Sequence, residues 1–133
     1  DGPLKIDLEN QVRTLNITER VKFFGYLENP YPYIKKADVL ALSSLWEGFG
    51  NVILESLALG TQVVSTDCPS GPSEILNNGE FGRLTLLNDS DDLAKKIVEA
   101  VKHPYDKTML VKRSRDFAED KISQQYLDIL LTC

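Results

Sequence analysis

The sequence predicts an α/β fold in which a parallel sheet carries helices on both faces. Short apolar runs alternate with helical patterns along almost the whole chain, and glycine or proline separates most of them. The runs at 39–42 and 62–66 contain no charged residue, which is typical of strands covered on both faces. Because strands that alternate with helices form parallel sheets, we predict a single domain over residues 1–133.

The first half of the chain contains two predicted strands and three predicted helices. Aliphatic residues at helical spacing predict a helix over 4–15, and an apolar run predicts a strand over 21–24. A proline-containing turn at 29–33 leads into a short helix, which is followed by the strand at 39–42. The next helix ends at Gly60, because glycine is common just after the end of a helix.

The second half continues this alternation. The strand at 62–66 is followed by a helix that starts at Gly71 and has proline in its first position. An Asn-Asn-Gly turn precedes a strand at 82–87, and the acidic run at 89–92 is predicted to cap a long helix that Pro104 ends. The last two helical patterns lie at 107–118 and 122–131.

Composition argues against several classes of function. The net charge is −5 and the Lys and Arg residues are scattered, so nucleic acid is not the expected partner. No apolar run approaches the roughly 18 residues that are needed to span a bilayer. Cys68 and Cys133 are too few for a disulfide framework and fit a reducing cytosol. Clustered histidines and ligand-like spacings are absent from the sequence, so no metal site is predicted.

The segment from Glu47 to Glu55 is the most informative part of the sequence. It reads Glu-Gly-Phe-Gly-Asn-Val-Ile-Leu-Glu and places its two carboxylates on either side of a Gly-x-Gly turn that enters an apolar helix. A carboxylate at Glu55 is costly in such a helix unless something binds it. The glycines leave the first N–H groups of the helix approachable, which suits a phosphate. This combination predicts a site for a phosphorylated, hydroxyl-rich ligand such as a nucleotide sugar.

The same segment resembles the Glu-x7-Glu motif of glycosyltransferase family 4, a large group of retaining enzymes with the GT-B fold. Further resemblances cover nearly the whole chain, in the order and spacing that the family shows. They are Asp1-Gly2-Pro3, Val21-Lys-Phe-Phe-Gly25, Ala37-Asp38-Val-Leu-Ala-Leu-Ser-Ser44, Gly60-Thr-Gln-Val-Val-Ser-Thr-Asp67 and Ser70-Gly-Pro-Ser-Glu-Ile75.

The resemblance implies a fold of two Rossmann-like domains that face each other across a cleft. This chain resembles only the C-terminal, donor-binding domain, so we expect an N-terminally truncated fragment of a larger two-domain enzyme. In the family, the acceptor domain and an Arg/Lys pair that clamps the donor diphosphate precede the part seen in this sequence. We therefore expect the chain to be inactive by itself.

The resemblance also implies roles for individual residues. Glu47, the predicted catalytic residue, would lie against the transferred sugar, and Glu55 would accept hydrogen bonds from the ribose hydroxyls. Backbone amides near Phe49 would face the sugar and the diphosphate, while those that follow Gly25 would meet the nucleobase. The predicted donor-binding set is Gly25, Tyr26, Leu27, Gly48, Phe49, Gly50, Asn51, Val52 and Glu55, and neither a metal nor another cofactor is expected.

Structural interpretations of these residues stay open. Glu55 could complement the helix dipole from the first turn, Glu47 could be an exposed loop acid, and Gly25 could mark a simple strand end. Other conspicuous side chains are predicted to be structural: Glu74 and His103 at helix ends, and Trp46 and Phe49 as wall or packing residues.

The predicted activity is metal-independent, retaining transfer of a hexose or N-acetylhexosamine from a nucleoside diphosphate to a glycan or lipid-linked acceptor, as in lipopolysaccharide assembly. The missing N-terminal domain would bind the acceptor. We expect a cytoplasmic protein that associates peripherally with the inner face of the membrane. Two alternatives remain: a non-catalytic nucleotide-binding or interaction module, of which a receiver domain is one version, and a GT-B epimerase of sugar nucleotides.

Overall fold

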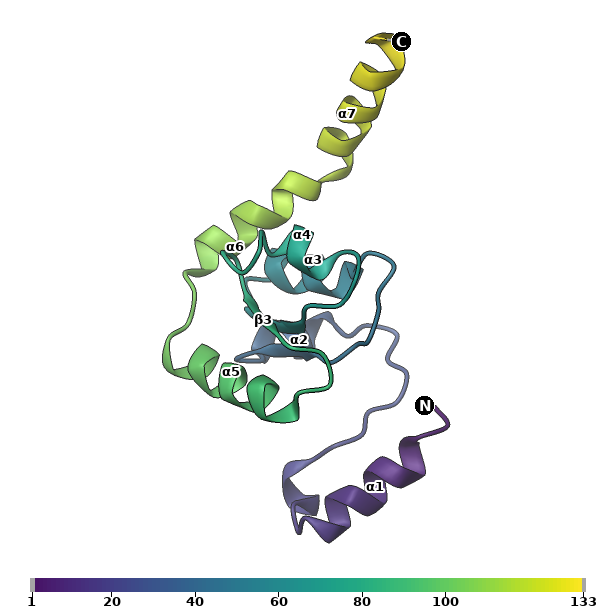
Figure 1. Cartoon of the computed structure of the whole chain (residues 1–133), viewed down its shortest axis with the longest axis vertical. Helices are drawn as coiled ribbons and strands as arrows, with labels where there is room; N and C mark the ends of the chain where they lie inside the picture. Colours follow the sequence, from purple (N-terminus) through teal and green to yellow (C-terminus); the bar gives the residue numbers. More distant parts are fainter. Residues whose placement is uncertain (1, 133) are drawn as a thin grey trace. The chain divides into compact units, whose positions relative to one another are not determined.

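The computed structural model of the protein describes residues 2–132, whose helices and strands are drawn in Figure 1. The chain falls into two compact units, one that ends at Pro30 and one that starts at Tyr31. The organisation as one domain therefore stays a prediction.

The first unit contains a helix, a short 3₁₀-helix and an extended segment. α1 (Lys5–Thr14) confirms the predicted helix, and η1 (Thr18–Arg20) follows it. The strand predicted at 21–24 is wrong, because these residues are not part of any strand. An apolar run supplies the side chains of a strand, but the backbone N–H and C=O groups also need a neighbouring strand. Among the described residues none forms a ladder with this segment.

The second unit is built on a parallel sheet of three strands, which are hydrogen-bonded in chain order. They are β1 (Leu40–Leu42), β2 (Val63–Thr66) and β3 (Arg83–Thr85). In this register Leu42 pairs with Ser65, and Thr66 pairs with Thr85. The carboxyl ends of the strands therefore lie side by side along one edge of the sheet.

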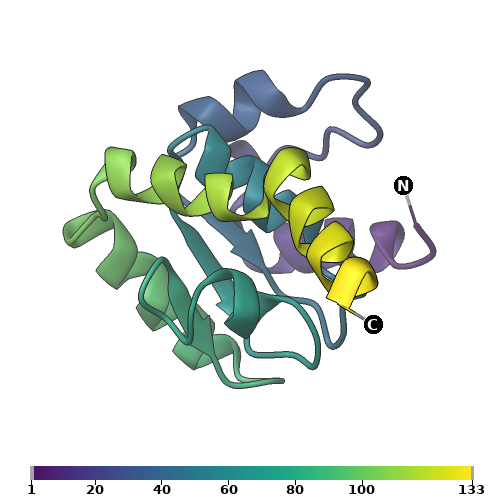
Figure 2. The same cartoon turned by 90° about the horizontal axis from the view of Figure 1, so that it is seen from above.

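Helices cover both faces of the sheet, as Figures 1 and 2 show. α5 (Ser90–Lys102) packs against β2 and β3, whereas α3 (Asn51–Ala58) packs against β2 and against α6 (Lys107–Ser114). Burial of one leucine or isoleucine side chain contributes about 1.5–3 kcal/mol to folding, so an aliphatic cluster beneath α3 holds this helix on the sheet. The cluster consists of Ile53, Leu57, Val63, Ile75, Leu76 and Leu110.

The strands differ in how completely they are covered. All residues of β2 are buried, which confirms the interpretation of its uncharged run as a strand covered on both faces. The same prediction is wrong for β1, where Ala41 is exposed and Leu40 and Leu42 are only half-buried. β1 lies at the end of the strand order, so fewer described residues surround it than surround the central strand.

Glycine, proline and asparagine define several element ends as predicted. α2 (Tyr31–Lys36) confirms the short helix but begins inside the turn predicted at 29–33, because proline is tolerated in the first turn of a helix. α4 (Pro72–Ile75) has proline in its first position, as predicted. Gly60 adopts a φ of +74° just beyond α3, which ends that helix. The turn at 77–79 also has positive φ angles at all its residues.

Aspartate side chains cap the two long helices that follow. The carboxylate of Asp89 accepts a hydrogen bond from the N–H of Asp92 (2.8 Å), which confirms that the acidic run caps α5. Asp106 caps α6 in the same way through the N–H of Met109 (3.0 Å). The remaining elements are η2 (Arg115–Phe117) and α7 (Glu119–Thr132). Within the described residues, no helix has both the length and the apolar character needed to cross a membrane.

Candidate functional site

The loops that follow β1 and β2 meet at the carboxyl edge of the sheet. Residues 43–50 connect β1 to α3, and residues 67–71 connect β2 to α4. The hydroxyl of Thr66, the last residue of β2, donates a hydrogen bond to the carbonyl of Ser44 in the first loop (2.5 Å). Ligand sites of parallel α/β sheets form outside this edge, so the two loops define the candidate site.

Gly71 brings the two loops into direct backbone contact. A Cβ atom at this position would lie 1.8 Å from the carbonyl oxygen of Phe49, and the φ angle of Gly71 is +96°. Both observations restrict the position to glycine. The sequence predicts Gly71 only as the start of α4, and nothing in its local pattern indicates a contact with the earlier loop.

Glu47 is held in place by a side-chain hydrogen bond. The hydroxyl of Ser44 donates to Oε1 of Glu47 at 2.6 Å, and both side chains are half-buried. The interpretation of Glu47 as a fully exposed loop acid is therefore wrong. Its predicted catalytic role is not tested by this geometry. Sequence reasoning missed Ser44 and Thr66, although the Ser-x-x-Glu spacing was a local signal for the first of these contacts.

The N-terminus of α3 offers backbone donors beside this loop. Gly50 precedes the helix in a left-handed conformation (φ 92°, ψ 47°), and the N–H of Ile53 donates to its carbonyl (2.8 Å). No side chain among the described residues caps the helix. The N–H groups of Asn51 and Val52 therefore have no acceptor within the helix. Such groups can meet an anion, and their contact with a diphosphate stays a prediction. The side chain of Val52 packs against the core, whereas Asn51 is exposed.

Glu55 is half-buried in the middle of α3. The first turn of α3 contains no acidic residue, so the interpretation of Glu55 as a dipole partner in that turn is wrong. The Glu55 carboxylate makes no hydrogen bond or ion pair within the part of the chain that the structure describes. A half-buried carboxylate without a partner is costly, which is compatible with a ligand. Its role in binding ribose stays a prediction.

The predicted nucleobase contacts belong to the first unit. Gly25 has a φ of +65°, as expected for a turn after an extended segment, and Tyr26 is 82% exposed. Leu27 is half-buried. The structure does not fix how this unit lies relative to Glu47, so the contribution of these residues to the site stays a prediction.

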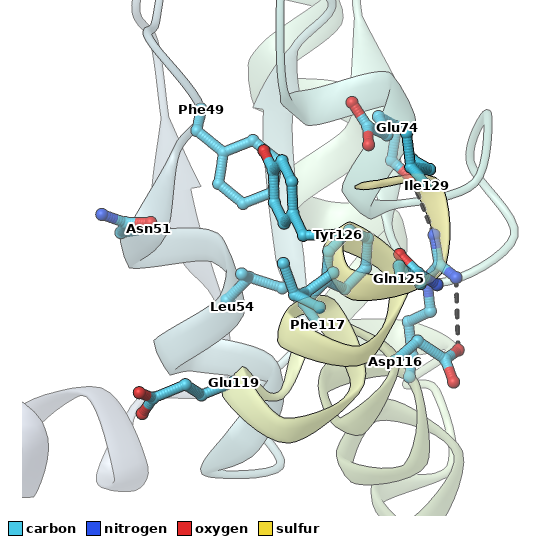
Figure 3. Close-up of a pocket in the computed structure, with 12 residues that line it drawn as sticks. Phe49, Asn51, Leu54, Glu74, Asp116, Phe117, Glu119, Gln125, Tyr126 and Ile129 are labelled. Carbon is cyan, nitrogen blue, oxygen red and sulfur yellow. Dashed lines mark hydrogen bonds and ion pairs between the residues drawn. The ribbon is translucent and has the colours of Figure 1, made fainter. Parts of the chain in front are cut away.

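A cavity of about 820 Å³ opens next to the N-terminus of α3, between this helix, α4 and α7 (Figure 3). It includes Phe49 and Asn51 of the predicted set but neither Glu47 nor Glu55. The ring of Phe49 packs edge-on against Phe117, with centroids 5.8 Å apart, which confirms its packing role. The other lining residues are Leu54, Glu74, Arg113, Asp116, Glu119, Ile122, Gln125, Tyr126 and Ile129.

Arg113 is the cation of this cavity, but protein groups already occupy it. Its Nε and Nη2 atoms donate to the carbonyls of Ile75 (2.8 Å) and Glu74 (2.7 Å). Its Nη1 atom pairs with Asp116 (3.3 Å). Hydrogen bonds from Lys121 and Arg113 hold the pKa of the Asp116 carboxyl below its usual value. Arg113 therefore joins α4 to α6, and we assign it no ligand.

The other predicted side chains are structural, with one exception. Glu74 lies in the first turn of α4, and His103 follows the last residue of α5, so both positions at helix ends are confirmed. Trp46 is 77% exposed, so a packing role among the described residues is wrong for it, and its role as a wall residue stays a prediction. Among the described residues there is no group of His, Cys, Asp and Glu side chains that could hold a metal.

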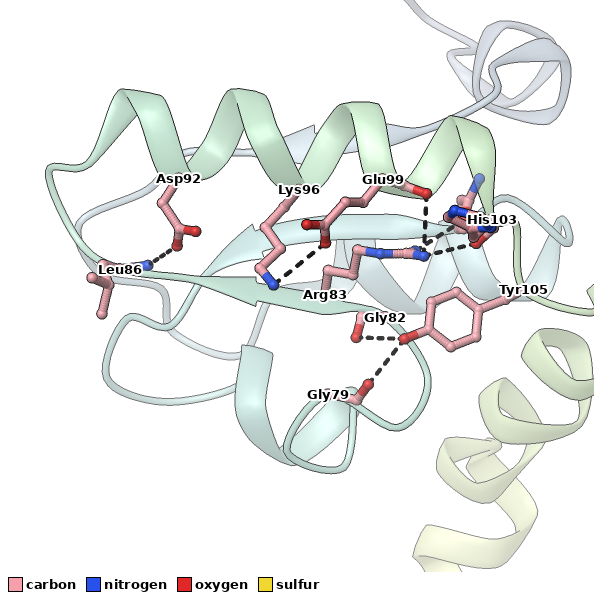
Figure 4. Close-up of polar contacts among 10 residues, drawn as sticks. Gly79, Gly82, Arg83, Leu86, Asp92, Lys96, Glu99, His103 and Tyr105 are labelled. Carbon is pink, nitrogen blue, oxygen red and sulfur yellow. Dashed lines mark hydrogen bonds and ion pairs between the residues drawn. The ribbon is translucent and has the colours of Figure 1, made fainter.

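The amino edge of the sheet carries a separate polar network, which Figure 4 shows. Arg83, the first residue of β3, donates to the carbonyl of His103 (2.7 Å) and stacks on the ring of Tyr105. The hydroxyl of Tyr105 donates to the carbonyls of Gly79 (3.0 Å) and Gly82 (3.1 Å). These contacts tie the end of α5 and the turn before β3 to the sheet.

Comparisons with known proteins agree with this architecture. The family model described as "Glycosyl transferases group 1" matches residues 1–103. An N-acetylgalactosaminyltransferase of Campylobacter jejuni that acts on a diphospho-undecaprenol-linked sugar is 35% identical, over 98% of this chain and 37% of its own length. The lipopolysaccharide core biosynthesis glycosyltransferase LpsE of Rhizobium meliloti is 33% identical, over 98% of this chain and 39% of its own length. The chain thus spans less than half the length of either relative.

Solved structures show the same fold. The apo form of the lipopolysaccharide outer core galactosyltransferase WaaB matches 99% of this chain and 39% of its own, with a TM-score of 0.88 at 22% identity. Anabaena HepE in complex with UDP matches 96% of this chain and 36% of its own, with a TM-score of 0.79 at 26% identity. The structural likenesses confirm the predicted fold class, and the family model with the relatives confirms the predicted family. The chain belongs to the group 1 glycosyltransferases.

Proposed function

We propose that this chain is the donor-binding domain of a retaining glycosyltransferase. The enzyme transfers a hexose or N-acetylhexosamine from a nucleoside diphosphate to a glycan or lipid-linked acceptor. The relative from Campylobacter jejuni is named for transfer of N-acetylgalactosamine to a lipid-linked diphosphate sugar, and LpsE is named for lipopolysaccharide core biosynthesis. HepE holds UDP in its solved structure.

The observation that carries the proposal is the combination of groups at the carboxyl edge of the sheet. Glu47 is fixed by Ser44 at 2.6 Å in a loop that ends at the uncapped N-terminus of α3. Glu55 follows in the same helix, half-buried and without a protein partner among the described residues. The segment therefore offers backbone donors for a diphosphate and carboxylates for sugar hydroxyls.

In the proposed reaction, the bond between the anomeric carbon and the diphosphate oxygen breaks, and the acceptor oxygen bonds to the same face of that carbon. The acceptor proton leaves with the nucleoside diphosphate, so no general base is needed from this domain. Donors at the N-terminus of α3 stabilise the charge that develops on the leaving diphosphate. Glu47 holds the transferred sugar, and Glu55 binds the ribose. The reaction needs no metal in this proposal.

In this proposal, parts of the protein other than this domain bind the acceptor and contact the membrane. A second domain binds the acceptor, as expected for a two-domain enzyme of this fold. The protein works in the cytoplasm, in peripheral contact with the inner face of the membrane when the acceptor is lipid-linked.

The test is a transfer assay with the intact protein over a panel of nucleotide sugars, in which wild type is compared with Glu55→Gln. We expect the variant to bind the donor about tenfold more weakly, because one carboxylate oxygen that accepts a ribose hydroxyl is replaced by an amide. Glu19→Gln is the control, since it makes the same change at an exposed position in η1.

The outcomes separate the proposed function from its alternatives. Unchanged donor affinity and full activity of Glu55→Gln would contradict the assigned role of Glu55. Transfer by the wild-type protein would exclude a non-catalytic binding module. Conversion of the sugar nucleotide without any acceptor would instead favour an epimerase.

A further inference from the structure

Two hydrogen bonds that share the residue Ser44 connect Glu47 to the central strand of the sheet. Thr66 ends the central strand, is 5% exposed, and donates its hydroxyl hydrogen bond to the carbonyl of Ser44 (2.5 Å). Ser44 in turn donates its own hydroxyl to Oε1 of Glu47 (2.6 Å). The Glu47 carboxylate is therefore linked to β2 through Ser44, whose hydroxyl donates to Glu47 and whose carbonyl accepts from Thr66.

The hydrogen bond from Thr66 holds the part of the loop that precedes Glu47, and the contact with Gly71 holds the part that follows it. The Thr66 bond holds the backbone where the chain leaves β1, and the backbone of Gly71 packs directly on the carbonyl of Phe49. Hydrogen bonds from a hydroxyl to a carboxylate are short and strong, typically about 2.5–2.7 Å. The contact between Ser44 and Glu47 has this length.

Only one oxygen of the Glu47 carboxylate is used in this way. Within the part of the chain that the structure describes, Oε2 has no hydrogen bond or ion pair. An ionised carboxylate can accept at both oxygens, so Oε2 keeps its capacity for a ligand hydroxyl. The arrangement thus orients the carboxylate through one oxygen and leaves the other available.

We propose that Ser44 and Thr66 are positioning residues that hold Glu47 against the transferred sugar. Thr66 sets the backbone of Ser44, and Ser44 sets the rotamer of Glu47, so neither hydroxyl touches the donor. This assignment rests on the proposed function, because the purpose of fixing Glu47 is to keep Oε2 at the sugar in the transition state.

The main experiment measures steady-state transfer by the intact protein with Ser44→Ala and Ser44→Thr. We expect Ser44→Ala to lower kcat about tenfold and to leave the donor KM nearly unchanged, because the lost hydrogen bond acts on a group that works in the transition state. Ser44→Thr keeps a hydroxyl and should recover most of kcat. Thr66→Val should lower kcat less than Ser44→Ala does, and Thr66→Ser should retain the wild-type kcat.

Two matched controls separate positioning from general damage. Ser123→Ala removes a hydroxyl from an exposed position of α7, outside the two loops of the candidate site. Thr85→Val removes one from an equally buried strand residue, 2% exposed, whose hydroxyl has a single hydrogen-bond partner among the described residues, the carbonyl of Ser65 (3.5 Å). We expect both controls to keep the wild-type kcat and KM.

A second measurement tests the link without relying on activity. Hydrogen exchange of the amides at 45–50 should be faster in Ser44→Ala and Thr66→Val than in wild type or in the two controls. The assignment is overturned if exchange in this loop is unchanged, or if kcat falls in Ser44→Ala and Ser44→Thr fails to restore it. A wild-type protein that transfers no sugar would instead contradict the proposed function, and the exchange data would still decide whether the link holds the loop.

Discussion

The two edges of the parallel sheet differ in how their polar groups are satisfied. At the amino edge, Arg83 donates to the carbonyls of Glu99 (3.4 Å) and His103 (2.7 Å), and Gln62 donates to those of Asp38 and Ala100 (both 3.0 Å), as Figure 4 shows in part. At the carboxyl edge, the N-terminus of α3 has no side-chain cap among the described residues.

This difference distinguishes polar groups that only stabilise the fold from polar groups that remain available to a ligand. A buried polar group that loses its partner costs about 1–3 kcal/mol, so a network used only for stability is expected to be saturated. The amino edge meets that expectation. The carboxyl edge instead keeps free capacity at the first amides of α3, at Oε2 of Glu47 and at Glu55, and a ligand can use all of these. We infer that changes to the polar groups of the first edge affect folding alone, whereas changes to the unsatisfied polar groups of the second edge affect the reaction.

The largest effect is expected from Gly71→Ala, which breaks the contact between the two loops of the site. The new Cβ would lie 1.8 Å from the carbonyl oxygen of Phe49, and alanine is disfavoured at a φ of +96°. Together the clash and the strained backbone should lower the free energy of unfolding by about 2–5 kcal/mol. Chemical denaturation of the purified protein measures this change.

Gly48→Ala is the matched control for that prediction. It lies in the first loop of the same site, but a Cβ at this position meets nothing within 4 Å. We expect a change in the free energy of unfolding within about 1 kcal/mol of wild type. Equal losses in the two variants would show that the loops tolerate no side chain anywhere, and that Gly71 has no special place in the site.

The next largest loss of stability is expected from Arg83→Met at the amino edge. The variant keeps the aliphatic stem but removes the donors to the part-buried carbonyl of Glu99 (3.4 Å) and to the exposed carbonyl of His103 (2.7 Å), together with the guanidinium that stacks on Tyr105. We expect the free energy of unfolding to fall by about 1–3 kcal/mol, while kcat and the donor KM of the folded protein stay unchanged. A lowered kcat at full folding would contradict the division of roles between the two edges.

Local sequence patterns predicted most of the fold, and the failures have a physical cause. The run at 62–66 was interpreted correctly because a central strand is buried whatever surrounds its edges. The runs at 21–24 and 39–42 are also mostly apolar, yet the first forms no strand and the second is only partly covered. Hydrophobicity is encoded in the run itself, whereas pairing and coverage depend on which other segments lie beside it.

The same reasoning applies to the candidate site. Glu47, Gly50 and Glu55 lie in one short segment, so their pattern could be recognised from the sequence. The contacts of Thr66 with Ser44 and of Gly71 with Phe49 join different loops, and no local periodicity encodes them. A sequence can thus indicate the groups that meet a ligand more readily than the groups that hold them in place.

A smaller effect is expected from Tyr105→Phe, which removes only a hydroxyl from the amino-edge network. That hydroxyl is shared between the carbonyls of Gly79 (3.0 Å) and Gly82 (3.1 Å). The free energy of unfolding should fall by about 0.5–1.5 kcal/mol. Tyr126→Phe is the control, because Tyr126 is 66% exposed and its hydroxyl makes no hydrogen bond within the described residues. An equal loss in both variants would mean that the Tyr105 hydrogen bonds do not stabilise this edge.

The smallest effect on stability is expected from Asp116→Asn. The Asp116 carboxylate has hydrogen-bond partners but is exposed to solvent. Its side chain is 47% exposed and pairs with Lys121 at 2.9 Å and with Arg113 at 3.3 Å. These partners lower the pKa of Asp116 in the folded protein below the value in the unfolded chain. The pair therefore contributes stability above the unfolded pKa, and this contribution is lost as the pH falls through the folded pKa.

Thermal unfolding of Asp116→Asn and wild type, at about pH 7 and about pH 2.5, measures that contribution. At the higher pH the variant should unfold at a slightly lower temperature than wild type, because an amide cannot pair with Lys121 as an ionised carboxylate does. The difference should shrink at the lower pH, where the wild-type carboxyl is protonated and resembles the amide. A difference that persists unchanged at low pH would show that packing, and not the charge of Asp116, determines its contribution. The exposed ion pair would then add no measurable stability, in contrast to the hydrogen bonds of the amino edge.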